Sequence, residues 1–138
     1  MLKLVVDTNI FISGFLWNGN EAKLLRLIEL GKAQLFISKE ILDEIERVLE
    51  KDKIKYIITK SDIEKRIILQ KIRELSTIVS PNVTVSICRD KDDNKLIECG
   101  VAAVADFIVT GDSDLLVLEK YGNLTIITTK RALEILSK

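Results

Sequence analysis

Carboxylates that follow apolar strands are the side chains best placed to do chemistry. Asp7 follows the apolar run Leu2–Val6, and Asp112 follows the run Phe107–Val109. Because ligands bind beyond the carboxyl ends of strands in an open parallel sheet, we expect both acids at one edge. Asp93 lies on the inward face at the start of a predicted helix that can open on the same edge. Like charges about 4 Å apart repel by about 4 kcal/mol at an effective dielectric constant near 20, so this pattern predicts a bound cation.

The absence of histidine limits the alternatives. The chain has no histidine and two cysteines, Cys88 and Cys99. Ser-His-Asp and Cys-His nucleophile systems, zincin helices and Cys/His fingers are therefore excluded. Ligation by oxygen alone favours Mg²⁺ or Mn²⁺. We expect both cysteines to be reduced, small core residues of an intracellular protein.

Each acid also has a purely structural interpretation. Asp7 is of a type favoured at helix N-caps, and Asp93 can be a partner of a helix dipole. Asp112 and Asp114 lie in a turn that contains a glycine, where aspartate is common, and Asp114 also suits an N-cap. Spacing alone does not decide between these interpretations and metal ligation.

Short β-branched runs alternate with amphipathic stretches, which predicts an α/β domain. We expect strands at Leu2–Val6, Leu35–Ile37, Phe107–Val109 and Leu124–Thr128, with a short strand or extended segment at Val83–Ile87. In the first half of the chain we expect helices at Asn9–Trp17, from a cap at Asn20 to a stop at Gly31, and at Lys39–Lys51 with Ser38 as its cap. A further helix should open at the capping box Ser61–Glu64. The remaining helices are expected to start within Arg89–Lys95, to span Leu115–Tyr121 up to Gly122, and to span Arg131–Ser137.

The predicted helix Lys39–Lys51 carries a further candidate acid. Its apolar stripe centres near Ile45, and Asp43 faces away from that stripe. Glu44 and Glu46 flank the two edges of the stripe, and periodicity does not choose between them. Most acids on helix surfaces are simply solvated.

Length and composition predict a single domain, residues 1–138. The chain has 47% hydrophobic and 30% charged residues, and a domain of this size can form a core without a metal or disulfide. No window approaches the roughly 20 apolar residues of a membrane span, and the start has no signal sequence, so we expect a soluble, cytoplasmic protein.

The net charge of zero hides two opposite regions. Residues 51–73 contain eight bases and three acids, a net charge of +5, whereas residues 89–119 contain three bases and eight acids, a net charge of −5. The basic stretch can supply phosphate contacts beside an acidic, metal-filled site. An ordinary solvated helix surface is the alternative.

Four segments in order resemble the PIN-domain ribonucleases, most of all the prokaryotic toxins of toxin–antitoxin pairs. The segments are 4–10, 38–45, 92–98 and 105–116. The resemblance implies a three-layer α/β/α Rossmann-like fold with a mainly parallel sheet. It also implies a metal site of Asp7, Glu44, Asp93 and Asp112, with Asp114 as an additional ligand and Thr8, Asn9, Ser38, Thr110 and Ser113 as polar groups that orient the carboxylates.

The resemblance selects Glu44 over Glu46. Lys91, Gly100 and Thr129 stand where Pro, Ala and Pro are common in the family, and none of these departures removes a carboxylate.

The hypothesis that follows is a Mg²⁺- or Mn²⁺-dependent endoribonuclease, the toxin of a toxin–antitoxin pair. One or two ions would generate hydroxide from water and stabilise the leaving 3′ oxygen. The implied partners are RNA, an antitoxin protein and a second copy in a homodimer. One alternative is a silent or antitoxin-inhibited RNA- or protein-binding module. Another, a HAD-like phosphatase with Asp7 as nucleophile, is disfavoured because Asn9 stands where that family has a second Asp.

Overall fold

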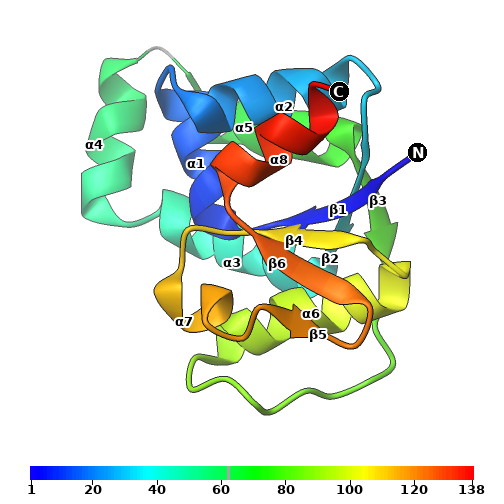
Figure 1. Ribbon diagram of the computed structural model, residues 1–138. Coiled ribbons are helices and arrows are strands. Elements are labelled where there is room, and N and C mark those ends of the chain that lie inside the picture. The colour runs from blue at the N-terminus through cyan, green and yellow to red at the C-terminus, as the bar shows by residue number, and fades with distance from the viewer. Residues whose placement is uncertain (62) are drawn as a thin grey trace.

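A mainly parallel sheet forms the centre of the molecule. The computed structural model describes residues 1–61 and 63–138, and within them six strands run in the order β3-β2-β1-β4-β6-β5 (Figure 1). All neighbouring pairs are parallel except β5 with β6. The strands are β1 Lys3–Val6, β2 Gln34–Ser38, β3 Ser76–Val79, β4 Phe107–Val109, β5 Lys120–Tyr121 and β6 Leu124–Ile127.

Helices cover both faces of this sheet. Figure 1 shows α2 and α8 on one face and α6 on the other, which confirms the predicted α/β architecture. The helices are α1 Thr8–Leu16, α2 Asn20–Glu29, α3 Lys39–Leu49, α4 Asp52–Lys60, α5 Lys65–Leu75, α6 Lys91–Ala103, α7 Ser113–Leu116 and α8 Thr129–Leu136. No helix in residues 1–61 and 63–138 is long and apolar enough to cross a bilayer.

The strand order places a crevice between β1 and β4. The chain moves from β1 to β2 on one side and later enters β4 on the other side, so the connections diverge at the carboxyl ends of these two strands. Val6 pairs with Val109, and the amide of Asp7 donates to the Val109 carbonyl at 3.0 Å. Residues directly after both strands are therefore held side by side.

The central strands are buried on both faces, as their apolar runs predict. Val5, Ile37 and Ile108 have no exposed surface. Cys99 is buried as expected, whereas Cys88 is half-buried, and both thiols are free.

The helix predicted after Ser61–Glu64 is present as α5, but its predicted start is wrong. It begins at Lys65, because Ser61 ends α4 and the Ser61 hydroxyl donates to the Ile58 carbonyl at 3.1 Å. Glu64 is the N-cap of α5 and makes no capping bond through its side chain. The second residue of the box, Asp62, lies outside the described residues. Helix α4 was not predicted at all.

The extended segment Val83–Ile87 forms no strand. The strand that pairs with β2 is β3, earlier in the chain. Val85 is nevertheless buried, and its amide donates to the Glu98 carboxylate of α6 at 2.9 Å. Val83 and Ile87 are exposed, so the alternation of these apolar residues does not mark a buried face.

Two turns also differ from the prediction. Gly19 occupies the N-cap of α2, and Asn20 is the first helical residue. The helix expected at Leu115–Tyr121 is shorter, because α7 ends at Leu116 and the chain turns back through Gly122, whose φ of 60° favours glycine, to pair β5 with β6.

Candidate active site

Asp7 is a buried carboxylate at the carboxyl end of β1. It is 8% exposed, and the Thr110 hydroxyl donates to its Oδ2 at 2.7 Å. Burial raises the pKa of Asp7, the Thr110 hydrogen bond opposes that rise, and the charge of Asp112 adds to it. Asp7 stands at the N-cap of α1, but its side chain makes no capping hydrogen bond. The amides of Thr8 and Asn9 still lower the pKa of Asp7, but less than burial raises it.

Asp93 and Asp112 form the most strongly interacting pair. Asp93 is 6% exposed in the first turn of α6. Burial raises its pKa to about 7, with further rises from the charge of Asp112 and from a hydrogen bond with it. Without a bound cation, Asp93 is therefore partly protonated near neutral pH.

Thr110 connects the acids that follow β1 and β4. Its hydroxyl donates to Asp7 and accepts from the amide of Asp112 at 3.0 Å. Asp112 in turn caps α7, because its Oδ1 accepts from the amide of Asp114 at 2.8 Å. Capping of this helix by Asp114, which was one interpretation of the sequence, is therefore wrong.

Helix α3 presents Glu44, and not Glu46, to these acids. Burial raises the pKa of Glu44 to about 7, and the charges of Asp92 and Asp7 contribute to the rise. Glu46 is exposed and lies 3.7 Å from the ammonium group of Lys65. The geometry thus distinguishes two acids that periodicity leaves equivalent.

Cations pair with the outer acids and leave the inner ones without a counter-charge. Arg89 contacts Asp114 at 3.1 Å, and Arg47 contacts Asp92 at 3.6 Å. In the part of the chain that the structure describes, no Lys or Arg lies within 4 Å of the inner acids, which are Asp7, Glu44, Asp93 and Asp112. The inner group therefore keeps an excess of negative charge.

The remaining predicted polar residues are spread around this edge. Ser38 caps α3 by accepting from the amide of Ile41 at 3.3 Å, while Ser113 is exposed at the start of α7. The Thr8 hydroxyl is buried and has no hydrogen-bond partner among the described residues, although it is close enough to Glu44 to oppose part of the rise in the pKa of that acid. Their roles in orienting carboxylates stay predictions.

The chemistry of the acids fits a hard divalent cation, but their side chains do not yet converge on one point. Within residues 1–61 and 63–138, no three acids or thiols converge closely enough to hold an ion. The donor set is nonetheless all oxygen, and no Lys or Arg among the described residues neutralises it. Side-chain rotation would be needed to bring them onto one ion.

A cavity of about 320 Å³ opens beside Asp7 and Asp112. Its other walls are Asn9, Ile10, Ser13, Glu21, Gly111 and Thr129. The sequence did not mark Glu21 as a site residue, because an acid in the first turn of a helix is the usual partner of the helix dipole. No local pattern marks it as facing Asp7 and Asp112.

The basic stretch is partly neutralised by acids. Lys65 pairs with Glu50 and Glu46, and Lys55 lies 3.4 Å from Glu50. Arg66 pairs with Glu64 at 3.3 Å. Phosphate contacts by this stretch therefore stay a prediction.

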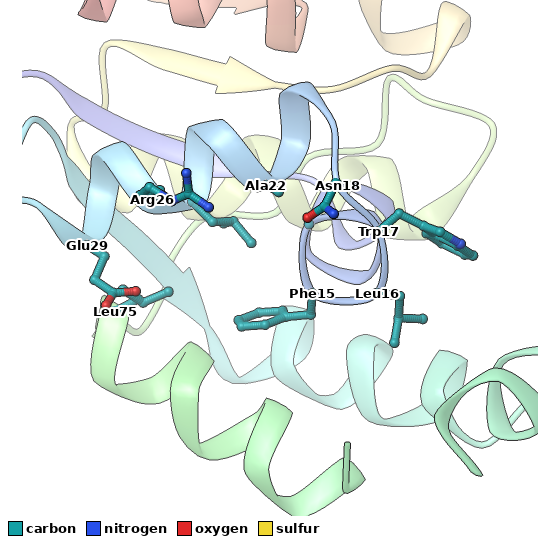
Figure 2. Close-up of a pocket in the computed structure, with 10 residues that line it drawn as sticks. Phe15, Leu16, Trp17, Asn18, Ala22, Arg26, Glu29 and Leu75 are labelled. Atoms are coloured by element: carbon teal, nitrogen blue, oxygen red, sulfur yellow. The ribbon is translucent and has the colours of Figure 1, made fainter. Parts of the chain in front are cut away.

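A second hollow lies on the other side of α1. Figure 2 shows Phe15, Trp17, Arg26 and Leu75 around it, and its volume is about 500 Å³. None of the candidate acids lines it.

Comparison with known proteins fixes the family. A family model described as PIN domain matches residues 3–114. The matched part includes the carboxylate edge, which consists of Asp7, Glu44, Asp93, Asp112 and Asp114. The chain belongs to the PIN domain family. A PIN domain is a nuclease fold, and PIN domains generally use divalent metal ions.

One relative of this PIN domain is an uncharacterized protein of Methanocaldococcus jannaschii. The two are 40% identical over 119 residues, which cover 85% of this chain and 75% of the relative. Strand β6 and helix α8 lie beyond the matched part of the PIN domain model, although β6 pairs directly with β4.

Proposed function

We propose that this PIN domain is an endoribonuclease that cleaves RNA phosphodiester bonds with Mg²⁺ or Mn²⁺. Asp7, Glu44, Asp93 and Asp112 would hold the ion, and Asp114 would assist from the rim. The observation that carries the proposal is the group of four buried or half-buried acids, Asp7, Glu44, Asp93 and Asp112, within 4 Å of which no Lys or Arg lies among the described residues. Folding tolerates such repulsion most readily where a ligand relieves it.

The ion supplies water activation and stabilises charge that develops on the phosphate. The chain itself positions the carboxylates. Thr110 fixes the spacing of the acids after β1 and β4 through its two hydrogen bonds. The buried strands beneath them fix the backbone at both strand ends, so that side-chain rotation alone would bring the acids onto one ion.

Cleavage of a labelled RNA tests this proposal. Wild-type protein should cut the RNA in Mn²⁺, leave 5′-phosphate ends and lose activity in EDTA. Glu44→Gln should lower the cleavage rate by roughly 100-fold or more, in the range seen when electrostatic groups of an active site are removed. Glu46→Gln is the matched control on the same helix and should cut at the wild-type rate. Equal rates for the two variants would contradict the assignment of Glu44.

We further propose that the protein is the toxin of a toxin–antitoxin pair and acts as a homodimer. The hollow beside Phe15, Leu16 and Trp17 supports a peptide partner, because these apolar side chains are only partly covered and Arg26 and Glu29 lie beside them. Expression should arrest growth, and the Asp93→Asn variant should not. Sedimentation of the purified protein should give twice the mass of the chain. Growth unaffected by wild-type protein that cuts RNA in vitro would contradict the toxin role.

A further inference from the structure

The cavity beside Asp7 and Asp112 extends away from the other site acids. Its walls come from α1, from α2, from the start of α8 and from the residues that follow β1 and β4. Glu44 and Asp93 reach the carboxylate edge from α3 and α6 instead. If the proposed function holds, a nucleotide whose phosphate meets the acids can therefore place a neighbouring group into this cavity.

The lining of the cavity favours a neutral group that donates hydrogen bonds. Glu21, Asp7 and Asp112 all face it, and three carboxylates repel a phosphate. Ser13 and Thr129 add hydroxyls, and Ile10 adds an apolar surface. A volume of about 320 Å³ lies at the small end of ligand pockets, which suits a single nucleobase.

Glu21 is the wall residue with unused hydrogen-bonding capacity. It is half-buried, and among the described residues its side chain has no ion pair or hydrogen bond. An ionised carboxylate only accepts hydrogen bonds, and its two oxygens can accept from two adjacent N–H groups. Guanine is the RNA base whose Watson–Crick edge presents two such groups, at N1 and N2.

We propose that this cavity is a guanine subsite and that Glu21 reads the base. This inference rests on the proposed ribonuclease function. Glu21 accepts hydrogen bonds from guanine N1–H and N2–H while the adjacent phosphodiester meets the cation that Asp7 and Asp112 would hold. Uracil would oppose its carbonyl oxygens to the carboxylate, and adenine and cytosine offer one amino group beside a ring acceptor. Unpaired bases of single-stranded RNA are read in this way at their edges.

Short RNAs that differ at one base test the subsite. The substrates are single-stranded oligouridines with one guanosine, inosine, adenosine or cytidine, cut in Mn²⁺. Wild-type protein should cut next to guanosine roughly tenfold faster than next to adenosine, the discrimination expected of a bidentate contact. Inosine lacks the N2 amino group and should give an intermediate rate.

Two variants of Glu21 separate base reading from other roles. Glu21→Ala should remove the preference, so that the ratio of the cleavage rates next to guanosine and next to adenosine falls from roughly ten to about one. Glu21→Gln keeps the volume of the side chain and one acceptor, so it should keep part of the preference. Glu29→Ala on the same helix is the control, because Glu29 is exposed, pairs with Lys71 at 3.4 Å and lies outside the cavity.

The possible outcomes are distinct. Active wild-type protein without a base preference, or a preference that survives in Glu21→Ala, overturns the subsite and leaves the ribonuclease proposal standing. A higher Mn²⁺ requirement for every RNA in Glu21→Ala also overturns it, because Glu21 would then belong to the metal site. If wild-type protein cuts none of the RNAs, the proposed function fails and the subsite fails with it. Thermal unfolding of both variants checks that they remain folded.

Discussion

Thr110 shows how one side chain organises an acidic cluster. Its hydroxyl contacts the carboxylate of Asp7 and the amide of Asp112, so a single buried residue controls two strand ends. The hydrogen bond stabilises the ionised form of Asp7 and opposes the effect of burial on the pKa. Even so, the inner acids destabilise the metal-free protein, because their mutual repulsion has no counter-charge within 4 Å among the described residues.

Removing one of these charges should stabilise the metal-free protein. Asp93→Asn removes a carboxyl whose pKa is raised by burial and by Asp112, so we expect its melting temperature in EDTA to exceed that of the wild type by a few degrees. Differential scanning calorimetry measures this shift. Asp43→Asn on the exposed face of α3 is the control and should change stability by no more than about 0.5 kcal/mol. A lower melting temperature for Asp93→Asn would contradict the repulsion.

The site residues were predictable only where local structure determines their position. Asp7 and Asp112 follow buried strands, and the geometry of a parallel sheet brings such ends together. Glu44 needed the family resemblance, because helical periodicity places it and Glu46 symmetrically about the apolar stripe. Glu21 gave no signal, since its approach to the cavity depends on how α2 packs on α1.

At the scale of elements, the close contact between α1 and α2 positions one wall of the cavity. A Cβ atom on Gly14 would lie 3.0 Å from Leu25 Cγ and 3.1 Å from the Glu21 carbonyl oxygen. Because the second contact is with backbone, the two helices can accommodate a methyl group only by moving apart.

Gly14→Ala should therefore destabilise the protein. We expect the free energy of unfolding to fall by about 1–3 kcal/mol, a cost typical of overpacking. Urea unfolding measures it. Gly19→Ala is a fair comparison, because a Cβ there meets no atom within 4 Å, and its cost should be clearly smaller. An equal loss in the free energy of unfolding for both variants would contradict a tight contact between α1 and α2 at Gly14.

Elements with a strong burial pattern were predicted well, and exposed ones were not. Strands β1, β2, β4 and β6 have continuous apolar runs and lie where the sequence places them. Strand β3 lies at the sheet edge with Thr77 and Ile78 exposed, so it lacks such a run. Helix α4 has no buried residue, which leaves its basic surface as its most obvious feature.

At the scale of the whole molecule, the carboxylate edge makes the free energy of unfolding depend on pH. Burial and neighbouring acids raise the pKa of Glu44 and of Asp93 to about 7, above their values of about 4 in an unfolded chain. Between those values the folded protein binds more protons than the unfolded chain does. The free energy of unfolding of the metal-free protein should therefore fall as the pH rises from about 4 to about 7.

Mg²⁺ should reverse this trend, because it binds the ionised acids of the folded state. Urea unfolding at a series of pH values, with EDTA and with saturating Mg²⁺, measures both effects. A metal-free protein whose stability rises steadily from pH 5 to pH 7 would contradict the raised pKa values.

The dependence of RNA cleavage on Mn²⁺ tests the central claim most directly, since it joins the acids, the cation and the reaction in one rate. With a single labelled RNA under single-turnover conditions, the wild-type rate should be zero in EDTA and should saturate as Mn²⁺ is added. The rate of Asp93→Asn at the same Mn²⁺ should be lower by roughly 100-fold or more. Cleavage that persists in EDTA and is unchanged in Asp93→Asn would contradict a carboxylate-held metal as the source of activity.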